Sequence, residues 1–262
     1  MVEWLENLGA KALGILMEIG RAGVFLFWSV VGIFRPPFKI MPIIKQIHVI
    51  GATSFTVIFF TGAFVGMVLG LQGNYTLRMF GAEGALGSAV ALSLVRELGP
   101  VLTGLMVTGR VGSSICAEVG IMRISEQIDA LECMAIDPYR YLISPKVVAS
   151  IISLPLLTAI FNIVGLMGGF LVGVRLLGGS EGAYLSTMKS SVMAADIRMC
   201  FIKSICFAIL IVWICADRGY WVHKSRNGFG AEGVSRATTH AVVISSVAIL
   251  VADYVITSLL LA

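Results

Sequence analysis

Residues 84–120 read GALGSAVALSLVRELGPVLTGLMVTGRVGSSICAEVG, a long apolar segment that carries Arg96, Glu97, Gly99 and Pro100 in its interior. An apolar run of about 20 residues is long enough to cross a bilayer as a helix. An arginine at the centre of such a helix costs about 2.5 to 3.5 kcal/mol, so ionisable residues there usually have a function and a charged partner. We therefore expect Arg96 and Glu97 to mark a functional site inside a transmembrane helix.

The composition of the whole chain is that of an integral membrane protein. Its 262 residues are 58% hydrophobic and 13% charged, with a mean hydropathy of +0.94, whereas soluble domains carry about 25% charged residues. The apolar runs lack the alternation of barrel strands, which favours helices. The basic residues behind the net charge of +4 lie beside apolar runs, as topology signals do. We predict one all-α membrane domain with no nucleic-acid partner.

Five apolar runs predict five transmembrane helices, at residues 47–72, 84–117, 147–174, 199–217 and 238–261. Residues 1–34 form an amphipathic stripe, and only 13 apolar residues precede Arg35, short of the roughly 20 that a span needs. We expect residues 1–34 to form an interfacial elbow helix. The alternative is a full first span from about 12 to 34, which would bury Glu18 and Arg21. The positive-inside rule places the N-terminus in the cytoplasm and the C-terminus outside.

Two sets of glycines recur at every fourth position: Gly62, Gly66 and Gly70, and Gly165, Gly169 and Gly173. Glycines at this spacing line one face of a helix, where another backbone can approach closely. The pattern predicts two packing faces. Each face could pack within the chain or against a second copy.

The segment between the second and third predicted spans contains a short amphipathic helix on the cytoplasmic side. The predicted helix covers residues 125–136, with Ser125 as its N-cap, and Asp137-Pro138 ends the pattern. Its acidic face favours docking on a cytoplasmic partner, because a helix lying on lipid headgroups would favour Lys and Arg. The residues expected to form the docking surface are Ser125, Glu126, Asp129, Leu131, Glu132, Met134 and Ile136.

Motifs of catalysis and metal binding are absent or out of context. Gly178–Gly182 matches G-x-S-x-G but follows a predicted membrane helix instead of the strand that a nucleophile elbow requires. The three histidines form no ligand cluster, and the five cysteines show no C-x-x-C spacing, so we expect no metal and interpret the cysteines as packing residues. No G-x-x-x-x-G-K-[ST] loop occurs. We predict a non-catalytic chain that binds no cofactor.

Four segments resemble the permease subunit of MCE-type ABC transporters, the Mla-type phospholipid systems of Gram-negative bacteria. They are LSLVRELGPVLTGLMVTGRVGSSICAEVG (92–120), ISEQIDALECMAIDPYRYLISPK (124–146), ISLPLLT (152–158) and GVSRATTHAVVISS (233–246). The resemblance implies a homodimeric permease of the bacterial inner membrane with an elbow, five spans and a cytoplasmic coupling helix, similar to the exporter fold of lipid-transporting ABCG-type proteins.

The same resemblance implies partners and site residues. Each copy would bind a cytoplasmic ATPase, which holds ATP and Mg and carries a STAS-domain subunit, and a hexameric MCE-domain ring would lie on the periplasmic side. Such a system moves phospholipids between the inner membrane and the ring and contributes to outer-membrane lipid asymmetry. A lipid cavity at the dimer interface would be lined by Leu69, Thr76, Leu77, Phe80, Arg96 and Glu97.

Helix geometry limits which residues can pair with Arg96 and Glu97. Adjacent residues on a helix do not face each other, so Glu97 should find its partner on another helix or on a second protomer. Asp253, at a comparable depth in the last span, is our predicted partner of Arg96. The pair could instead only lock helix packing.

Two other functions are alternatives to the lipid permease. The first is an ion-coupled secondary carrier built on Glu97, Lys203 and Asp253. The second is an intramembrane lipid-modifying enzyme, which lacks a nucleophile in this sequence.

Overall fold

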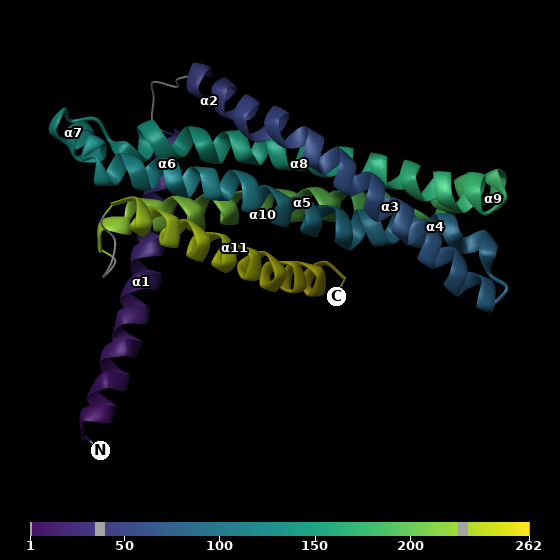
Figure 1. Ribbon diagram of the computed structural model, residues 1–262, viewed down its shortest axis with the longest axis horizontal. Coiled ribbons are helices and arrows are strands. Elements are labelled where there is room, and N and C mark those ends of the chain that lie inside the picture. Colours follow the sequence, from purple (N-terminus) through teal and green to yellow (C-terminus); the bar gives the residue numbers. More distant parts are fainter. Residues whose placement is uncertain (1, 35–39, 225–229, 262) are drawn as a thin grey trace.

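The protein is helical throughout the part of the chain that the structure describes. The computed structural model describes residues 2–34, 40–224 and 230–261, and no strand occurs in these ranges (Figure 1). The α-helices are α1 (Val2–Phe34), α2 (Ile40–Ile47), α3 (Thr53–Met79), α4 (Leu86–Ser93), α5 (Gly99–Val107), α6 (Ser113–Ile124), α7 (Gln127–Cys133), α8 (Ser144–Phe170), α9 (Glu181–Ser191), α10 (Ala194–Tyr220) and α11 (Gly230–Leu261).

Short π-helical turns join several of these helices end to end. They lie at His48–Ala52, Leu94–Leu98, Thr108–Gly112, Tyr139–Ile143 and Leu171–Leu176. Among the described residues, five continuous helices are therefore long and apolar enough to cross a membrane: Ile40–Met79, Glu83–Ile124, Tyr139–Leu176, Ala194–Tyr220 and Gly230–Leu260. The prediction of an all-α protein with five spans is confirmed. The helices extend beyond the predicted runs because their hydrogen bonding continues into the polar residues at each end.

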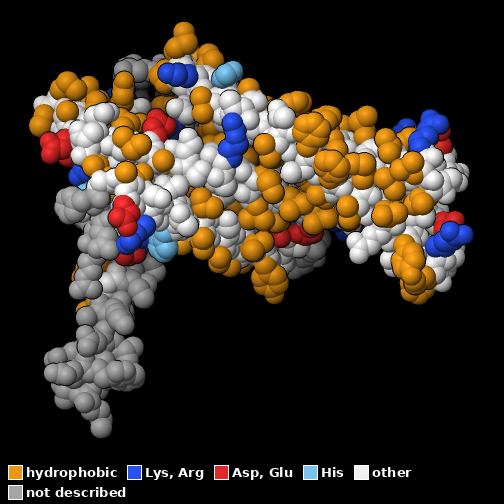
Figure 2. Space-filling view, viewed as in Figure 1, with side chains coloured by type: hydrophobic (Ala, Val, Ile, Leu, Met, Phe, Trp, Pro, Cys, Tyr) orange, Lys and Arg blue, Asp and Glu red, His pale blue; other side chains and the backbone are white. Residues whose placement is uncertain are grey.

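The spans form an elongated bundle with an apolar exterior. Hydrophobic side chains cover much of the visible face along its length, and charged side chains gather mainly towards its two ends (Figure 2). This distribution is the one that a bilayer requires, because a charged side chain in contact with hydrocarbon is costly.

Helix α1 lies across one end of the bundle, near α7, and does not run alongside the spans (Figure 1). Its Phe25 is buried, with ring-centroid distances of 5.3 Å to Tyr139 and 5.7 Å to Tyr220. Trp213 Nε1 donates a hydrogen bond of 2.7 Å to the carbonyl oxygen of Ala22. Among the described residues, α1 is not one of the five helices that are long and apolar enough to cross a membrane. That it lies in the interface stays a prediction.

The two glycine sets, apart from Gly173, pack against each other within one chain, where α3 crosses α8 (Figure 1). A Cβ atom added to Gly66 would lie 1.9 Å from the carbonyl oxygen of Gly165, and one added to Gly70 would lie 2.8 Å from that of Gly169. No larger residue fits at Gly66 without moving a backbone. Of the two alternatives for these glycines, the structure shows the contact within the chain.

The short helix predicted at residues 125–136 is shorter than expected and begins differently. Helix α7 covers Gln127–Cys133, not residues 125–136. The prediction of Ser125 as its N-cap is wrong: Ser125 ends α6, and its hydroxyl donates back to the carbonyl oxygen of Ile121 at 2.8 Å. Glu126 turns the chain with a left-handed φ of 57°. Ile128 is fully buried and anchors the short helix.

The cysteines are all free, as expected of packing residues. Cys116, Cys200 and Cys215 are buried and Cys206 is partly buried, which agrees with a role as small apolar side chains. Cys133 differs, since it is exposed at the end of α7.

Candidate functional site

Arg96 and Glu97 belong to a group of charged side chains that three helices bring together inside the spans. We call this group the span charge cluster; its members are Arg96, Glu97, Asp196, Lys203 and Asp253. Arg96 and Glu97 lie in the π-helical turn Leu94–Leu98, and α10 and α11 supply the other three residues. Two cations thus meet three carboxylates within the apolar part of the bundle.

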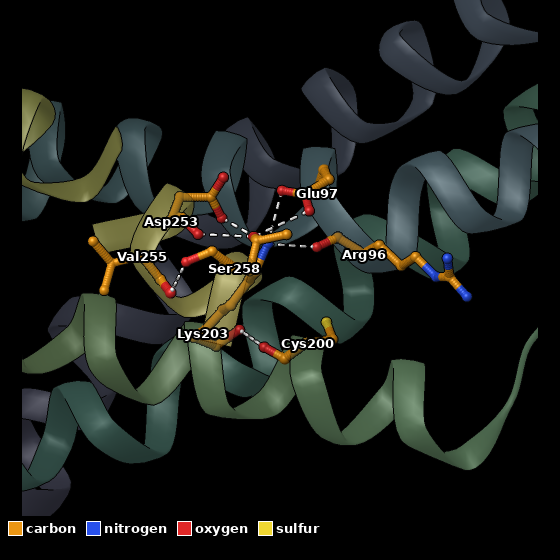
Figure 3. A network of polar contacts seen from close by, with 9 residues as sticks. Arg96, Glu97, Cys200, Lys203, Asp253, Val255 and Ser258 are labelled. Carbon is orange, nitrogen blue, oxygen red and sulfur yellow. Dashed lines mark hydrogen bonds and ion pairs between the residues drawn. The ribbon is translucent and has the colours of Figure 1, made fainter. Parts of the chain in front are cut away.

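Lys203 lies at the centre of this cluster and has no exposed side-chain surface. Its Nζ atom is 2.7 Å from Glu97 Oε2 and 2.8 Å from Asp253 Oδ1. Figure 3 shows the two carboxylates around the amine, with the main-chain oxygen of Arg96 facing it as well. Lys203 therefore holds Glu97 and Asp253 in place from the inside.

Pro100 explains why Lys203 also bonds to the main chain. Proline has no N–H, so the carbonyl oxygen of Arg96, four residues earlier, loses the helical hydrogen bond that it would otherwise accept. Lys203 Nζ donates to that oxygen at 2.8 Å. A buried carbonyl group without a donor is unfavourable. The lysine therefore supplies the hydrogen bond that the proline cannot donate.

Arg96 has a different partner from the one predicted. Its Nε atom donates to Asp196 Oδ1 at 2.7 Å, while Asp253 pairs with Lys203. The prediction that Asp253 neutralises Arg96 is therefore wrong, because depth in the membrane does not determine which way each helix is rotated. Asp196 is in turn fixed by the first turn of α10, where its Oδ2 accepts a hydrogen bond of 2.9 Å from the main-chain nitrogen of Met193.

The two adjacent charges point in different directions. The guanidinium of Arg96 extends away from Lys203, whereas Glu97 points towards it (Figure 3). Glu97 Oε1 also accepts a hydrogen bond of 3.2 Å from Thr257 of α11. The prediction that Glu97 finds its partner on another helix is confirmed.

The outer members of the cluster stay accessible while the inner members are buried. The side chains of Arg96 and Glu97 are 36% and 40% exposed, against 0% for Lys203 and 7% for Asp196. One nitrogen of Arg96 is engaged by Asp196, and a guanidinium has five N–H donors. The arrangement can present a cation and an anion to a polar ligand within the membrane.

Four of the predicted lipid contacts lie in a row along α3 and its end: Leu69, Thr76 and Leu77 on the helix, and Phe80 as its C-cap. Leu69 and Leu77 are half-buried and pack on the core, whereas Thr76 and Phe80 are exposed. The row is about 16 Å long, since a helix rises 1.5 Å per residue.

A separate apolar cavity of about 440 Å³ lies between α8, α9 and α10. Its lining includes Val95, Asn162, Lys189 and Phe201 and contains none of the six predicted lipid-binding residues. The predicted cargo site is therefore not this cavity.

The remaining motif matches have structural explanations. Ser180, the serine of the G-x-S-x-G match, caps α9 by accepting a hydrogen bond from the main-chain nitrogen of Ala183. Among the described residues, no group of three or more His, Cys, Asp or Glu side chains could hold a metal ion.

Sequence reasoning missed Asp196 and Thr257 and did not place Lys203 beside Arg96. The signal for Lys203 was present, because a lysine within an apolar run needs a partner. The sequence gives no comparable indication for Asp196. It lies before the apolar run, where an aspartate is expected in the first turn of a helix.

The fold and the site together define a multi-pass helical membrane protein that holds a polar site inside its spans. The chain belongs to the MlaE permease family, since residues 43–259 match the family described as Permease MlaE. It is 41% identical over 263 residues to the intermembrane phospholipid transport system permease protein MlaE of Haemophilus influenzae, covering 99% of this chain and 98% of that protein.

Two other relatives come from a different bacterium and from a plant. A probable ABC transporter permease protein of Rickettsia bellii is 42% identical over 254 residues, covering 97% of this chain and 96% of the relative. The chloroplastic protein TRIGALACTOSYLDIACYLGLYCEROL 1 of Arabidopsis thaliana is 36% identical over 215 residues, 82% of this chain and 60% of the relative.

Proposed function

We propose that this chain is the membrane permease subunit of an ATP-driven transporter that moves phospholipids between the bacterial inner membrane and a periplasmic MCE-domain partner, and so contributes to outer-membrane lipid asymmetry. Membership of the MlaE family and 41% identity to a phospholipid transport permease support this function. The N-terminus lies in the cytoplasm and the C-terminus in the periplasm, as the distribution of basic residues favours.

The observation that carries the proposal is the half-exposed pair of opposite charges at Arg96 and Glu97 within an apolar span. A phospholipid presents a phosphate, in many cases an amine, and two acyl chains. Arginine has forked donors suited to phosphate, a carboxylate suits an amine, and the surrounding apolar surface suits the chains. The buried Lys203 and Asp196 keep the two outer side chains in place before a lipid arrives.

A second copy of the chain completes the cargo site. In the apolar centre of the spans, 28% of the residues of Ile40–Met79 and 11% of Gly230–Leu260 are buried, against 50–56% in the other three. The two least buried spans carry the predicted row on α3 and the Glu97 contact Thr257 on α11. In the homodimer, α3 and α11 of both copies face each other and enclose the lipid.

Helix α7 connects the permease to a cytoplasmic ATPase, which binds ATP and Mg and carries a STAS-domain subunit. Glu126, Gln127 and Met134 are exposed. These three side chains form the surface that contacts the ATPase. Asp129 and Glu132 instead fix α7 to the bundle: Asp129 pairs with Arg123 at 2.7 Å, and Glu132 accepts a hydrogen bond of 3.0 Å from Tyr220. Since Tyr220 ends α10, movement of α7 reaches the helix that carries Lys203.

Lipid transfer by the reconstituted complex tests this function. Arg96→Ala and Glu97→Gln should each reduce ATP-dependent transfer of labelled phospholipid to the MCE partner by about tenfold, the effect of one lost charge-assisted hydrogen bond. Glu83→Gln changes an exposed carboxylate at the outer end of the same span and should leave transfer unchanged. Undiminished transfer by both site variants would refute the site assignment.

One observation keeps the ion-coupled carrier as a second hypothesis: Glu97, Lys203 and Asp253 do meet in one cluster. A carrier of this kind would work without an ATPase. Lipid movement by the isolated chain, driven by a proton or sodium gradient alone, would support it over the permease.

A further inference from the structure

Arg110 is a second arginine within the span Glu83–Ile124, and it lies outside the span charge cluster. It belongs to the π-helical turn Thr108–Gly112 and is exposed. Its Nη1 atom donates to Thr53 Oγ1 at 2.8 Å and to Ser54 Oγ at 3.1 Å, both from α3. These two bonds fix the direction of the guanidinium and leave its other N–H donors available.

The charge of Arg110 is not neutralised within the described part of the chain. No carboxylate of residues 2–34, 40–224 or 230–261 forms an ion pair with it, whereas Arg96 has Asp196 and Lys203 has two carboxylates. Two hydroxyl groups accept hydrogen bonds but carry no charge. An arginine inside a span without an anion is costly, so the position calls for an anionic ligand.

The depth of Arg110 indicates which part of the membrane supplies this ligand. Arg110 lies 14 residues from Arg96 and 14 from Ile124, or about 21 Å along the helix axis in each direction. The hydrocarbon core is about 30 Å thick, so the two arginines lie at different depths, Arg110 nearer the α7 end. An anion that reaches an apolar surface at this depth is the phosphate of a lipid.

The surface beside Arg110 is open to such a ligand. Gly109 is exposed, and a Cβ atom added there would meet no atom within 4 Å. Ser114, one turn further along, is exposed as well. A headgroup can therefore approach the free donors of Arg110 without displacing a side chain.

We propose that Arg110, oriented by Thr53 and Ser54, binds the phosphate of a phospholipid in the half of the bilayer nearer α7. The inference rests on the phospholipid-permease function and adds a second headgroup site about 21 Å from Arg96. Lipid thus meets one arginine in each half of the membrane.

Photo-crosslinking tests the proposal in the assembled complex. Benzoylphenylalanine replaces Gly109, and the complex is reconstituted in vesicles of ³²P-labelled phosphatidylethanolamine and phosphatidylglycerol. Arg110→Gln keeps a donor for Thr53 and Ser54 but removes the charge, and it should lower the lipid label by about tenfold or more. Arg110→Lys keeps the charge and should keep most of the label.

Two controls separate lipid binding from packing. A crosslinker at Leu156, an exposed residue of α8 at a similar distance from the α7 end, should label equally in every variant. Thr53→Val combined with Ser54→Ala removes the two orienting hydrogen bonds and keeps the charge, so its label should fall, but by clearly less than that of Arg110→Gln. A structural role would make this double variant lose as much label as Arg110→Gln.

Three results would overturn the proposal: unchanged label in Arg110→Gln, a crosslink to the second copy of the chain in place of lipid, or loss of label on adding inorganic phosphate. The first means that the charge is not used, the second that a partner carboxylate neutralises it, and the third that the site takes free phosphate. The Arg96→Ala transfer assay is independent of this label, so the failure of the permease function and of this site can be told apart.

Discussion

Replacing Lys203 by Met removes the cation on which Glu97 and Asp253 converge. Methionine has a similar length and fills the same space without a charge. The variant leaves two carboxylates close together inside the spans, and the carbonyl oxygen of Arg96 loses its donor. We expect the folded state to be destabilised and the direction of Glu97 to be lost.

The size of the effect follows from the exposure of the three side chains. Breaking a buried ion pair by removing one partner costs about 3 to 5 kcal/mol. Lys203 is fully buried and Asp253 is 17% exposed, but Glu97 is 40% exposed and water screens part of its charge. We therefore expect the lower end, about 3 kcal/mol, which corresponds to a fall of about 6 to 12 °C in Tm for a protein of this size.

Thermal melting of the purified complex, followed by loss of the monodisperse species on size exclusion, measures this change. Combining Lys203→Met with Asp253→Asn removes the more buried of the two unpaired carboxylates. The double variant should therefore recover at least half of the fall in Tm that Lys203→Met causes. Lys189→Met changes an exposed lysine of α9 and is the matched control. Its Tm should equal that of the wild type. A wild-type Tm for Lys203→Met, or no recovery in the double variant, would refute the reasoning.

Three further predictions address packing, docking and the cap. Gly66→Ala should lower the stability by about 1 to 3 kcal/mol through overpacking against α8, while Gly182→Ala, in open space, should not destabilise the protein in the same melting assay. Glu126→Lys should reduce the amount of ATPase that co-purifies by about tenfold. Glu181→Lys, the same change on α9, is the control, and equal amounts of ATPase with both variants would contradict docking through α7. Asp196→Ala removes the carboxylate that accepts from the main-chain nitrogen of the N-cap Met193 and should cost about 0.5 to 2 kcal/mol from this lost bond alone, seen as a lower Tm.

The spans and their packing faces could be predicted from the sequence because both depend on short-range patterns. Apolar runs located the five spans, and the four-residue spacing of Gly66 and its neighbours identified a packing face. The choice between packing within the chain and packing between two copies could not be made, because the same small residues serve either contact.

The charge partners within the site could not be predicted from the sequence for a different reason. Depth along a span can be counted in residues, which is why Asp253 was rightly placed near the level of Arg96. The rotation of each helix about its axis depends on contacts over the whole bundle, and it pairs Asp253 with Lys203. One part of the hydrogen bond from Lys203 to the main chain could be predicted, since Pro100 has no N–H to donate to the carbonyl oxygen of Arg96 four residues earlier.

The start of α7 shows how a local signal can mislead. Ser125 precedes an amphipathic stretch and matches the pattern of an N-cap. Its hydroxyl instead bonds back to Ile121 and closes α6, because the chain reverses at Glu126 in a left-handed conformation. A serine between two helices can cap the start of one or end the other, and the sequence alone does not distinguish these roles.

A cryo-electron-microscopy map of the purified complex in phospholipid nanodiscs tests the central claim most directly. The account predicts two copies that face each other through α3 and α11, with density for a two-tailed lipid between the two copies of residues 69–97. Copies that meet through other helices, or lipid density confined to the cavity between α8, α9 and α10, would contradict it.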